Sequence, residues 1–224
     1  HRKRVIIVGV NKERFSQSHE LCKKIINEFY YDIMPSHRLS SLPRTVKDAI
    51  GDLPVIMPSK DVIRQDGHKY SHVPIDGGGV MNHIPRFHSE RDQAIFRLLG
   101  EDIESGRNEY VSTEALKRLY TKMTGKQSNI HKYYVLRWNE QSNTIPAHLY
   151  KDGMRHIHPD SRQARSITVR EAARLQTFAD DFEFLGPTMA QYKMIGNAVP
   201  VNLAYHVAMS ILEALKRHNI NIGE

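Results

Sequence analysis

Residues 168–178 read TVREAARLQTF and predict a short helix that begins at a capping box. The Thr168 side chain can accept a hydrogen bond from the backbone N–H of Glu171, and the Glu171 side chain can accept one from the backbone of Thr168. Arg170 and Arg174 then lie four residues apart, on one face of the helix. Taken alone, this pattern is typical of an ordinary amphipathic helix in which the arginines serve packing.

Downstream, residues 196–200 read GNAVP and precede a long apolar stretch. We expect Gly196 and Asn197 to form a turn that begins a last helix, running from about Val201 to Lys216. Small side chains in such a turn let a ligand approach backbone N–H groups at a helix N-terminus. A turn without a ligand is the other interpretation.

Upstream, the chain begins with HRKR at residues 1–4 and continues with the apolar run VIIVG. An unbroken run of β-branched residues predicts a buried strand, which requires neighbouring strands. Arg2 and Arg4 stand directly before it. They are either a solvated strand end or a pair of guanidinium groups suited to a phosphate or a base carbonyl.

The part of the chain between these motifs predicts a mixed α+β fold. Apolar periodicity and capping residues indicate helices at residues 17–31, at residues 45–50, after Ser89 and at residues 112–123. Strands are expected at residues 133–138 and 144–150. Residues 52–88 are rich in Pro, Gly and His and predict an irregular surface segment. Cys22 falls on the first helix, where we expect a buried small apolar residue.

Composition narrows the class of protein. The chain has 224 residues, and 32 Lys and Arg against 25 Asp and Glu give a formal net charge of +7, which favours an anionic partner. A single cysteine excludes an internal disulfide and a thiolate metal cluster. His148, His156 and His158 lack a well-spaced fourth ligand, so no metal is expected. Without a signal peptide or a bilayer-length apolar run, we expect a cytoplasmic protein with no membrane partner.

In this order, the three motifs resemble the C-terminal part of the DNA (cytosine-5)-methyltransferase family. Residues 1–9 resemble its Gln-x-Arg-x-Arg strand, with the Gln expected just before residue 1. Residues 168–178 resemble its Arg-Glu-x-x-Arg-Leu-Gln motif, and residues 196–200 its Gly-Asn-Ala-Val-Pro motif. Ala179 and Val201 stand where the family usually has Pro. The resemblance implies a target-recognition domain combined with a strand and a C-terminal helix of a Rossmann-like class I methyltransferase domain.

The resemblance also implies domain boundaries. Residues 1–10 would be a strand of the catalytic domain, and residues 11–195 would form the target-recognition domain. Residues 196–218 would carry the cofactor-side turn and the C-terminal helix that returns to the catalytic domain.

The same resemblance implies roles for individual residues. The family flips a cytosine out of duplex DNA and moves a methyl group from S-adenosylmethionine to its C5 atom. Arg2 and Arg4 would line the catalytic pocket, and Thr144 would bind a phosphate near the flipped base. The cofactor would contact Asn197, Ala198 and Val199. The other DNA-binding candidates are Arg155, Arg162, Arg165, Arg170 and Arg174, of which the last two would mostly brace the domain.

Further polar side chains in the recognition region are candidate base or phosphate readers, although a solvated surface charge is the commoner role for any one of them. They are Arg64, Gln65, Lys69, Arg86, His88, Arg91, Lys151 and His156.

Three parts of the family pattern are missing. The family's nucleophilic Cys follows a Pro, whereas Cys22 follows Leu21. The glycine-rich cofactor loop and the Glu-Asn-Val segment are also absent. We therefore expect the chain alone to be inactive and to need an N-terminal catalytic half, in the same parent chain or as a separate subunit. Double-stranded DNA would be its substrate, in a nucleoid-associated prokaryotic restriction-modification system. The alternative is a non-enzymatic, sequence-specific DNA-binding module.

Overall fold

The computed structural model describes residues 6–11, 18–39, 44–65, 67–76, 79–151 and 153–220. Arg2 and Arg4, the predicted catalytic arginines, lie outside the described residues. The chain forms two compact units, a smaller one made of His1–Pro43 with Val199–Glu224 and a larger one made of Arg44–Ala198. The predicted division into catalytic and target-recognition domains, with boundaries after residues 10 and 195, stays a prediction about the parent enzyme.

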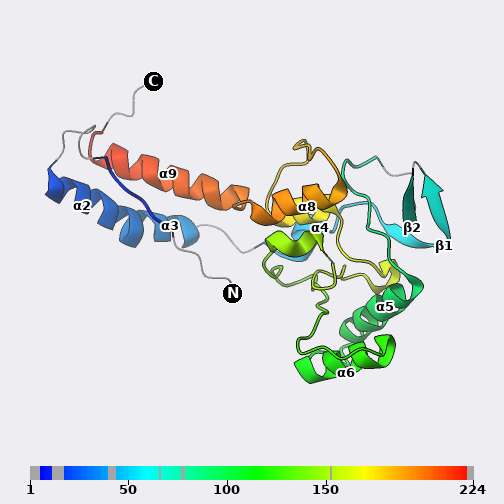
Figure 1. Ribbon diagram of the computed structural model, residues 1–224. Helices are drawn as coiled ribbons and strands as arrows, with labels where there is room; N and C mark the ends of the chain where they lie inside the picture. The colour runs from blue at the N-terminus through cyan, green and yellow to red at the C-terminus, as the bar shows by residue number, and fades with distance from the viewer. Residues whose placement is uncertain are drawn as a thin grey trace. The chain divides into compact units, whose positions relative to one another are not determined.

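The smaller unit is helical in its described part. It contains α2 (His19–Glu28), the π-helical η1 (Phe29–Ile33), α3 (Met34–Leu39) and α9 (Val201–Arg217). The Ser18 hydroxyl caps α2 by accepting from the Leu21 N–H at 3.2 Å. Figure 1 shows α9 running alongside α2 and α3, and the side chains between them form one core. Cys22 is buried on α2, which confirms the sequence-based expectation.

The predicted buried strand at the start of the chain is wrong for its described part, residues 6–10. These residues have no regular secondary structure, and the Ile7 side chain is 89% exposed. The Tyr30 hydroxyl holds this segment in place, because it donates to the carbonyl of Ile6 and accepts from the N–H of Val8. A buried strand needs strand neighbours, and the described residues of this unit supply only helices.

The larger unit holds the remaining elements. They are α4 (Val46–Ile50), β1 (Ile56–Gln65), β2 (His68–Pro74), α5 (Glu90–Glu104), α6 (Thr113–Thr124), the 3₁₀ turns η2 (Ala147–Tyr150) and η3 (Ser161–Gln163), α7 (Val169–Leu175) and α8 (Thr188–Asn197). The predicted helices are confirmed, with side-chain caps from Thr45, Ser89, Ser112 and Thr168.

Two sequence-based expectations for this unit are wrong. Residues 52–88 are not irregular throughout, because β1 and β2 form an antiparallel hairpin whose register breaks between Pro58 and Ile63. Residues 133–138 and 144–150 are not regular strands. The first contributes a single bridge, from Val135 to Ile157, and the second ends in the 3₁₀ turn η2.

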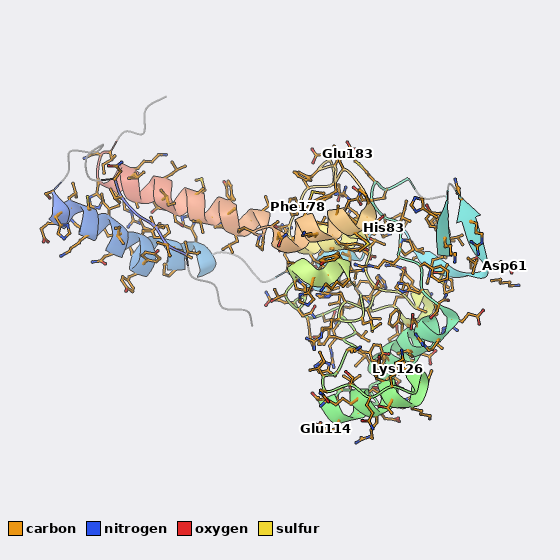
Figure 2. All side chains as sticks on the ribbon, viewed as in Figure 1. Asp61, His83, Glu114, Lys126, Phe178 and Glu183 are labelled. Atoms are coloured by element: carbon orange, nitrogen blue, oxygen red, sulfur yellow. The ribbon has the colours of Figure 1, made fainter. Side chains whose placement is uncertain are left out.

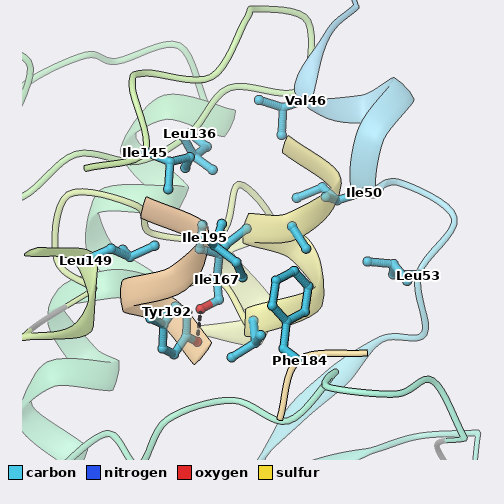
Figure 3. Packing of buried hydrophobic residues seen from close by; sticks show 13 residues of the cluster. Val46, Ile50, Leu53, Leu136, Ile145, Leu149, Ile167, Phe184, Tyr192 and Ile195 are labelled. Carbon is cyan, nitrogen blue, oxygen red and sulfur yellow. Dashed lines mark hydrogen bonds between the residues drawn. The ribbon is translucent and has the colours of Figure 1, made fainter. Parts of the chain in front are cut away.

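The core of the larger unit lies where α7 and α8 meet α4 and η2. Figure 3 shows its side chains, with Ile195, Ile167 and Tyr192 near the centre. The Tyr192 hydroxyl donates to the carbonyl oxygen of Ile167 at 2.8 Å, so the buried polar end of this ring is satisfied. A second core under α5 and α6 contains Ile95, Phe96 and Leu116, among others.

The GNAVP motif lies at a break between two helices rather than at the start of one. Gly196 and Asn197 are the last residues of α8, Ala198 is extended, and Pro200 directly precedes α9. The predicted position of the turn is therefore wrong by about two residues. By length and composition alone, Thr188–Arg217 could cross a membrane. This break divides it, and α8 places Tyr192 and Ile195 in the core of the larger unit.

Candidate nucleic-acid interface

A buried ion pair stands at the start of α7. The Arg165 guanidinium donates to both carboxylate oxygens of Glu171, each at 2.7 Å, and both side chains are 1% exposed. Arg165 also donates to the side chain of Gln163. Glu171 simultaneously closes the capping box by accepting from the Thr168 N–H at 2.7 Å. One carboxylate thus begins α7 and neutralises a buried arginine.

The charge state of this centre follows from its surroundings. Burial alone would raise the pKa of Glu171, but the charge and hydrogen bonds of Arg165 hold that pKa well below its usual range. Burial lowers the pKa of His158 to about 3, so the 3.5 Å contact from its Nε2 to Glu171 involves a neutral imidazole at pH 7. His83, labelled in Figure 2, is buried nearby, and burial lowers its pKa too.

Arg170 and Arg174 brace the loops around α7. Arg170 is fully buried and donates to the backbone carbonyls of Met81, Ala179 and Phe182, each at 3.0 Å. Arg174 donates two hydrogen bonds to the carboxylate of Asp180 and forms an ion pair with Asp52, which follows α4. The hydrogen bonds that Arg174 donates to the carboxylates of Asp180 and Asp52 raise its pKa. The guanidinium groups of Arg165, Arg170 and Arg174 are therefore committed to the fold.

An exposed polar segment lies outside this centre. Thr144 and Arg155 are both exposed, and Arg155 donates to the carbonyl of His131 at 3.0 Å. The side-chain amide of Asn143 holds the Arg155 carbonyl at 2.9 Å. Behind them, Nε2 of buried His156 lies 3.3 Å from the Thr144 carbonyl. The structure thus brings Thr144 and Arg155 into one surface segment that buried groups support.

Arg162 lies on η3, with its side chain 72% exposed. Its guanidinium forms two hydrogen bonds of 2.9 Å with the carboxylate of Asp160, which also caps η3. Arg162 is exposed enough to meet a phosphate, but it would have to share its charge with Asp160.

The predicted cofactor residues lie at the break after α8. Asn197 is exposed and ends α8, Ala198 is half-buried, and Val199 begins the C-terminal part of the smaller unit. Gly196 has a packing role, because a Cβ atom there would lie 2.2 Å from the carbonyl oxygen of Pro146. The backbone of α8 therefore rests directly on the segment that follows Thr144.

Two supporting residues have little signal in the sequence. Asn143 is recognisable only by its place beside Thr144. Arg86 is a candidate DNA reader by sequence, whereas in the structure its guanidinium lies 3.9 Å above the Tyr192 ring. It donates to the carbonyls of Leu149 and Tyr150 and so fixes η2. Among the described residues, no cluster of three or more His, Cys, Asp or Glu side chains could hold a metal ion.

Comparison with known proteins decides the family. The chain matches the C-5 cytosine-specific DNA methylases over residues 1–213. The chain belongs to this family. A type II methyltransferase of Bacillus paralicheniformis, M.Bpa9945I, is 34% identical over 231 residues, which cover 97% of this chain and 48% of that protein. The Escherichia coli type II methyltransferase M.Eco47II is 35% identical, over 78% of this chain and 36% of its own length.

The similarity extends to a protein of Arabidopsis thaliana, and in each of these comparisons the chain covers only part of the relative's length. DNA (cytosine-5)-methyltransferase 2 of Arabidopsis thaliana is 33% identical over 76% of this chain and 12% of its own length. This C-5 methylase chain spans about half the length of M.Bpa9945I and less of the other two. The resemblance drawn from the three motifs is thus confirmed at the level of the family.

Proposed function

We propose that this chain carries the target-recognition region and part of the cofactor pocket of a DNA cytosine-5 methyltransferase. The observation that carries the proposal is the exposed segment holding Thr144 and Arg155 in a chain of the C-5 methylase family. His156 supports this segment from behind, and its carbonyl accepts from the Ile167 N–H, two residues after Arg165 of the buried ion pair. In the parent enzyme, methyl transfer to C5 of a flipped cytosine would take place beside this segment.

DNA recognition would use the exposed side chains. Thr144 offers a hydroxyl to a phosphate, while Arg155 and Arg162 offer guanidinium groups to phosphates or base edges. Arg165, Arg170 and Arg174 would act from behind the surface. Moving Arg165 to DNA would leave the Glu171 charge buried without a partner, at a cost of several kcal/mol.

The cofactor side would involve Asn197, Ala198 and Val199. The Asn197 amide and the Val199 side chain are exposed, and Ala198 is small, so these residues fit contact with a polar and partly apolar ligand. S-adenosylmethionine, when bound, would supply the methyl group. Arg2 and Arg4 would complete the catalytic pocket, as the family motif implies.

The nucleophile would come from an N-terminal catalytic half, in the same parent chain or in a separate subunit. Cys22 is the one cysteine of the sequence, and it is 4% exposed in the core of the smaller unit. A thiol in that position cannot reach a base. We propose that the chain alone transfers no methyl group and that the parent acts in the cytoplasm as a restriction-modification enzyme. Methyl transfer by the isolated chain, abolished by Cys22→Ala, would overturn this assignment.

Duplex affinity tests the recognition segment. Arg155→Ala should weaken binding of the chain to duplex DNA by about tenfold and reduce the slope of log K against log salt by about one. Arg97→Ala is the matched control, because it removes the same charge from an exposed position on α5. Fluorescence anisotropy at two salt concentrations measures both quantities. Equal losses for the two variants would mean that the segment is only part of a diffuse positive surface.

A further inference from the structure

The larger unit contains a pocket that the recognition segment does not use. It has a volume of about 360 Å³ and is formed by the start of β2, the loop at residues 82–87 and the first turns of α8. This volume lies near the lower end of the range of about 300–1,000 Å³ that is usual for small-molecule sites. The pocket is therefore large enough for a ligand of nucleotide size.

The pocket wall combines aromatic rings with positive charge. Tyr70, Phe87 and Tyr192 supply rings, and Lys69 and Arg86 supply cations. None of the described residues that line the pocket is acidic. Lys69 is exposed and makes no ion pair within the described part of the chain. Rings and cations without carboxylates are the chemistry that proteins use to hold a base and its phosphate.

Arg86 adds a positive charge that is held in one position. Its terminal nitrogens bond the η2 carbonyls, and its guanidinium is stacked on Tyr192, so the group cannot rotate freely. Its Nε atom is buried and has no hydrogen-bond acceptor among the described residues. The positive charge of Arg86 therefore stays fixed at the pocket wall, where it favours an anionic ligand.

The exposed apolar side chains that line the pocket also favour a ligand. Phe87, Ile84 and Met189 line the pocket and remain 43%, 56% and 60% exposed. Large apolar side chains left in water beside cations favour a ligand with a flat apolar face and an anionic end.

We propose that this pocket binds a nucleotide, with the base against Phe87 and Tyr70 and the phosphate on Lys69. The proposal goes beyond the proposed recognition of DNA, because Thr144 and Arg155 do not line the pocket. Arg86 is the link between the two, since it lines the pocket and also holds η2.

Calorimetric titration of the whole chain with AMP, adenosine and inorganic phosphate tests the proposal. AMP should bind saturably and more tightly than either of the other probes, because only AMP carries both ring and phosphate. Lys69→Gln and Phe87→Leu should each weaken AMP binding by about tenfold. Their matched controls are Lys60→Gln on β1 and Phe182→Leu, two exposed positions outside the pocket, which should bind AMP normally. Unfolding midpoints show that each variant is folded.

Some results of these titrations would overturn the proposal. Absence of AMP binding, or binding that both pocket variants leave unchanged, overturns the proposal. Phosphate binding as tight as AMP binding, unaffected by Phe87→Leu, would make the pocket a simple anion site and overturn the base contact. Arg155→Ala separates the two functions, because it should weaken duplex DNA binding and leave AMP affinity intact. Titration of a short DNA duplex into the Lys69→Gln chain shows whether the bound nucleotide can be part of DNA. If it can, Lys69→Gln should weaken binding of the duplex as well.

Discussion

At the residue scale, Glu171 performs two structural tasks with one side chain. The capping box was readable from the sequence, because Thr168 and Glu171 have the required spacing. The ion pair was not readable, since Arg165 looked like any basic residue in a recognition region. Its burial depends on Gln163, His158 and the turn η3, which place the guanidinium against the carboxylate. The spacing of residues along the chain predicts helix caps. The burial of a side chain depends on packing against residues distant in the sequence, so spacing alone does not predict it.

Breaking the Arg165–Glu171 pair should destabilise the larger unit strongly. Glu171→Gln leaves the Arg165 charge buried without a counter-charge, which costs about 3–5 kcal/mol. Glu140→Gln is the matched control, because it breaks the exposed pair with Arg137 and should cost less than about 1 kcal/mol. Urea unfolding curves give both values. Similar losses for the two variants would contradict the importance of burial at Glu171.

Buried histidines should make the chain sensitive to acid. Burial lowers the pKa of His72 and His156 to about 4 and that of His88 and His158 to about 3, from a usual value of 6.5. Between about pH 6.5 and pH 4 the unfolded chain therefore binds more protons, and falling pH favours unfolding. Each histidine contributes up to about 1.4 kcal/mol per pH unit in this window.

Unfolding midpoints measured from pH 7 to pH 4 test this expectation. His156→Asn removes one titrating group and should flatten the pH dependence, even if it lowers stability at pH 7. Asn139→Gln, at an exposed position that carries no titrating group, should leave the pH dependence as it is. A wild-type chain whose stability does not change between pH 6.5 and pH 4 would contradict the expectation.

At the element scale, caps made helices predictable and long-range pairing made strands difficult to predict. Four helices begin directly after a residue whose side chain caps them, and such residues can be recognised in the sequence. These residues are Thr45, Ser89, Ser112 and Thr168. Helix α8 was missed because Pro187 precedes it without a side-chain cap. The hairpin β1–β2 was missed because Pro58 and several charged residues obscure its alternation. Residues 144–150 have apolar side chains, but they pair with no strand in the described part of the chain. The contact between α8 and η2 depends on Gly196, which the sequence suggested only as a turn residue.

Adding a methyl group at this contact should be costly. In Gly196→Ala the new Cβ atom would meet the Pro146 carbonyl oxygen at 2.2 Å, so the backbone of α8 or η2 must move. Overpacking of this kind costs about 1–3 kcal/mol, which exceeds the gain of about 0.5–1 kcal/mol from replacing a helical glycine. Gly9→Ala is the control, because nothing lies within 4 Å of its added Cβ. Thermal unfolding measures the difference, and a stabilised Gly196→Ala chain would show that the contact is loose.

At the scale of the whole molecule, α9 carries more apolar surface than its own unit covers. One side of the helix packs on α2, η1 and α3 through Val207, Ile211 and Ala214. The opposite side has an outer stripe of apolar residues at helical spacing, all at least 36% exposed: Val201, Tyr205, Met209 and Leu212. A helix that is apolar on two opposite sides is typical of a buried element. We expect the catalytic half proposed above, supplied from outside this chain, to pack on this stripe of α9.

Substitutions on the two sides of α9 should therefore behave differently. Met209→Gln combined with Leu212→Gln changes only the outer stripe, so the isolated chain should keep its unfolding midpoint and bind less of a dye that reports exposed apolar surface. Val207→Gln combined with Ile211→Gln is the control, and it should lower the midpoint because amide groups would enter the covered core. When the catalytic half is present, the outer-stripe variant should lose methyl transfer because the two parts no longer associate. Full activity in that variant would show that the catalytic half packs elsewhere. Equal destabilisation by both pairs in the isolated chain would show that the stripe is already covered.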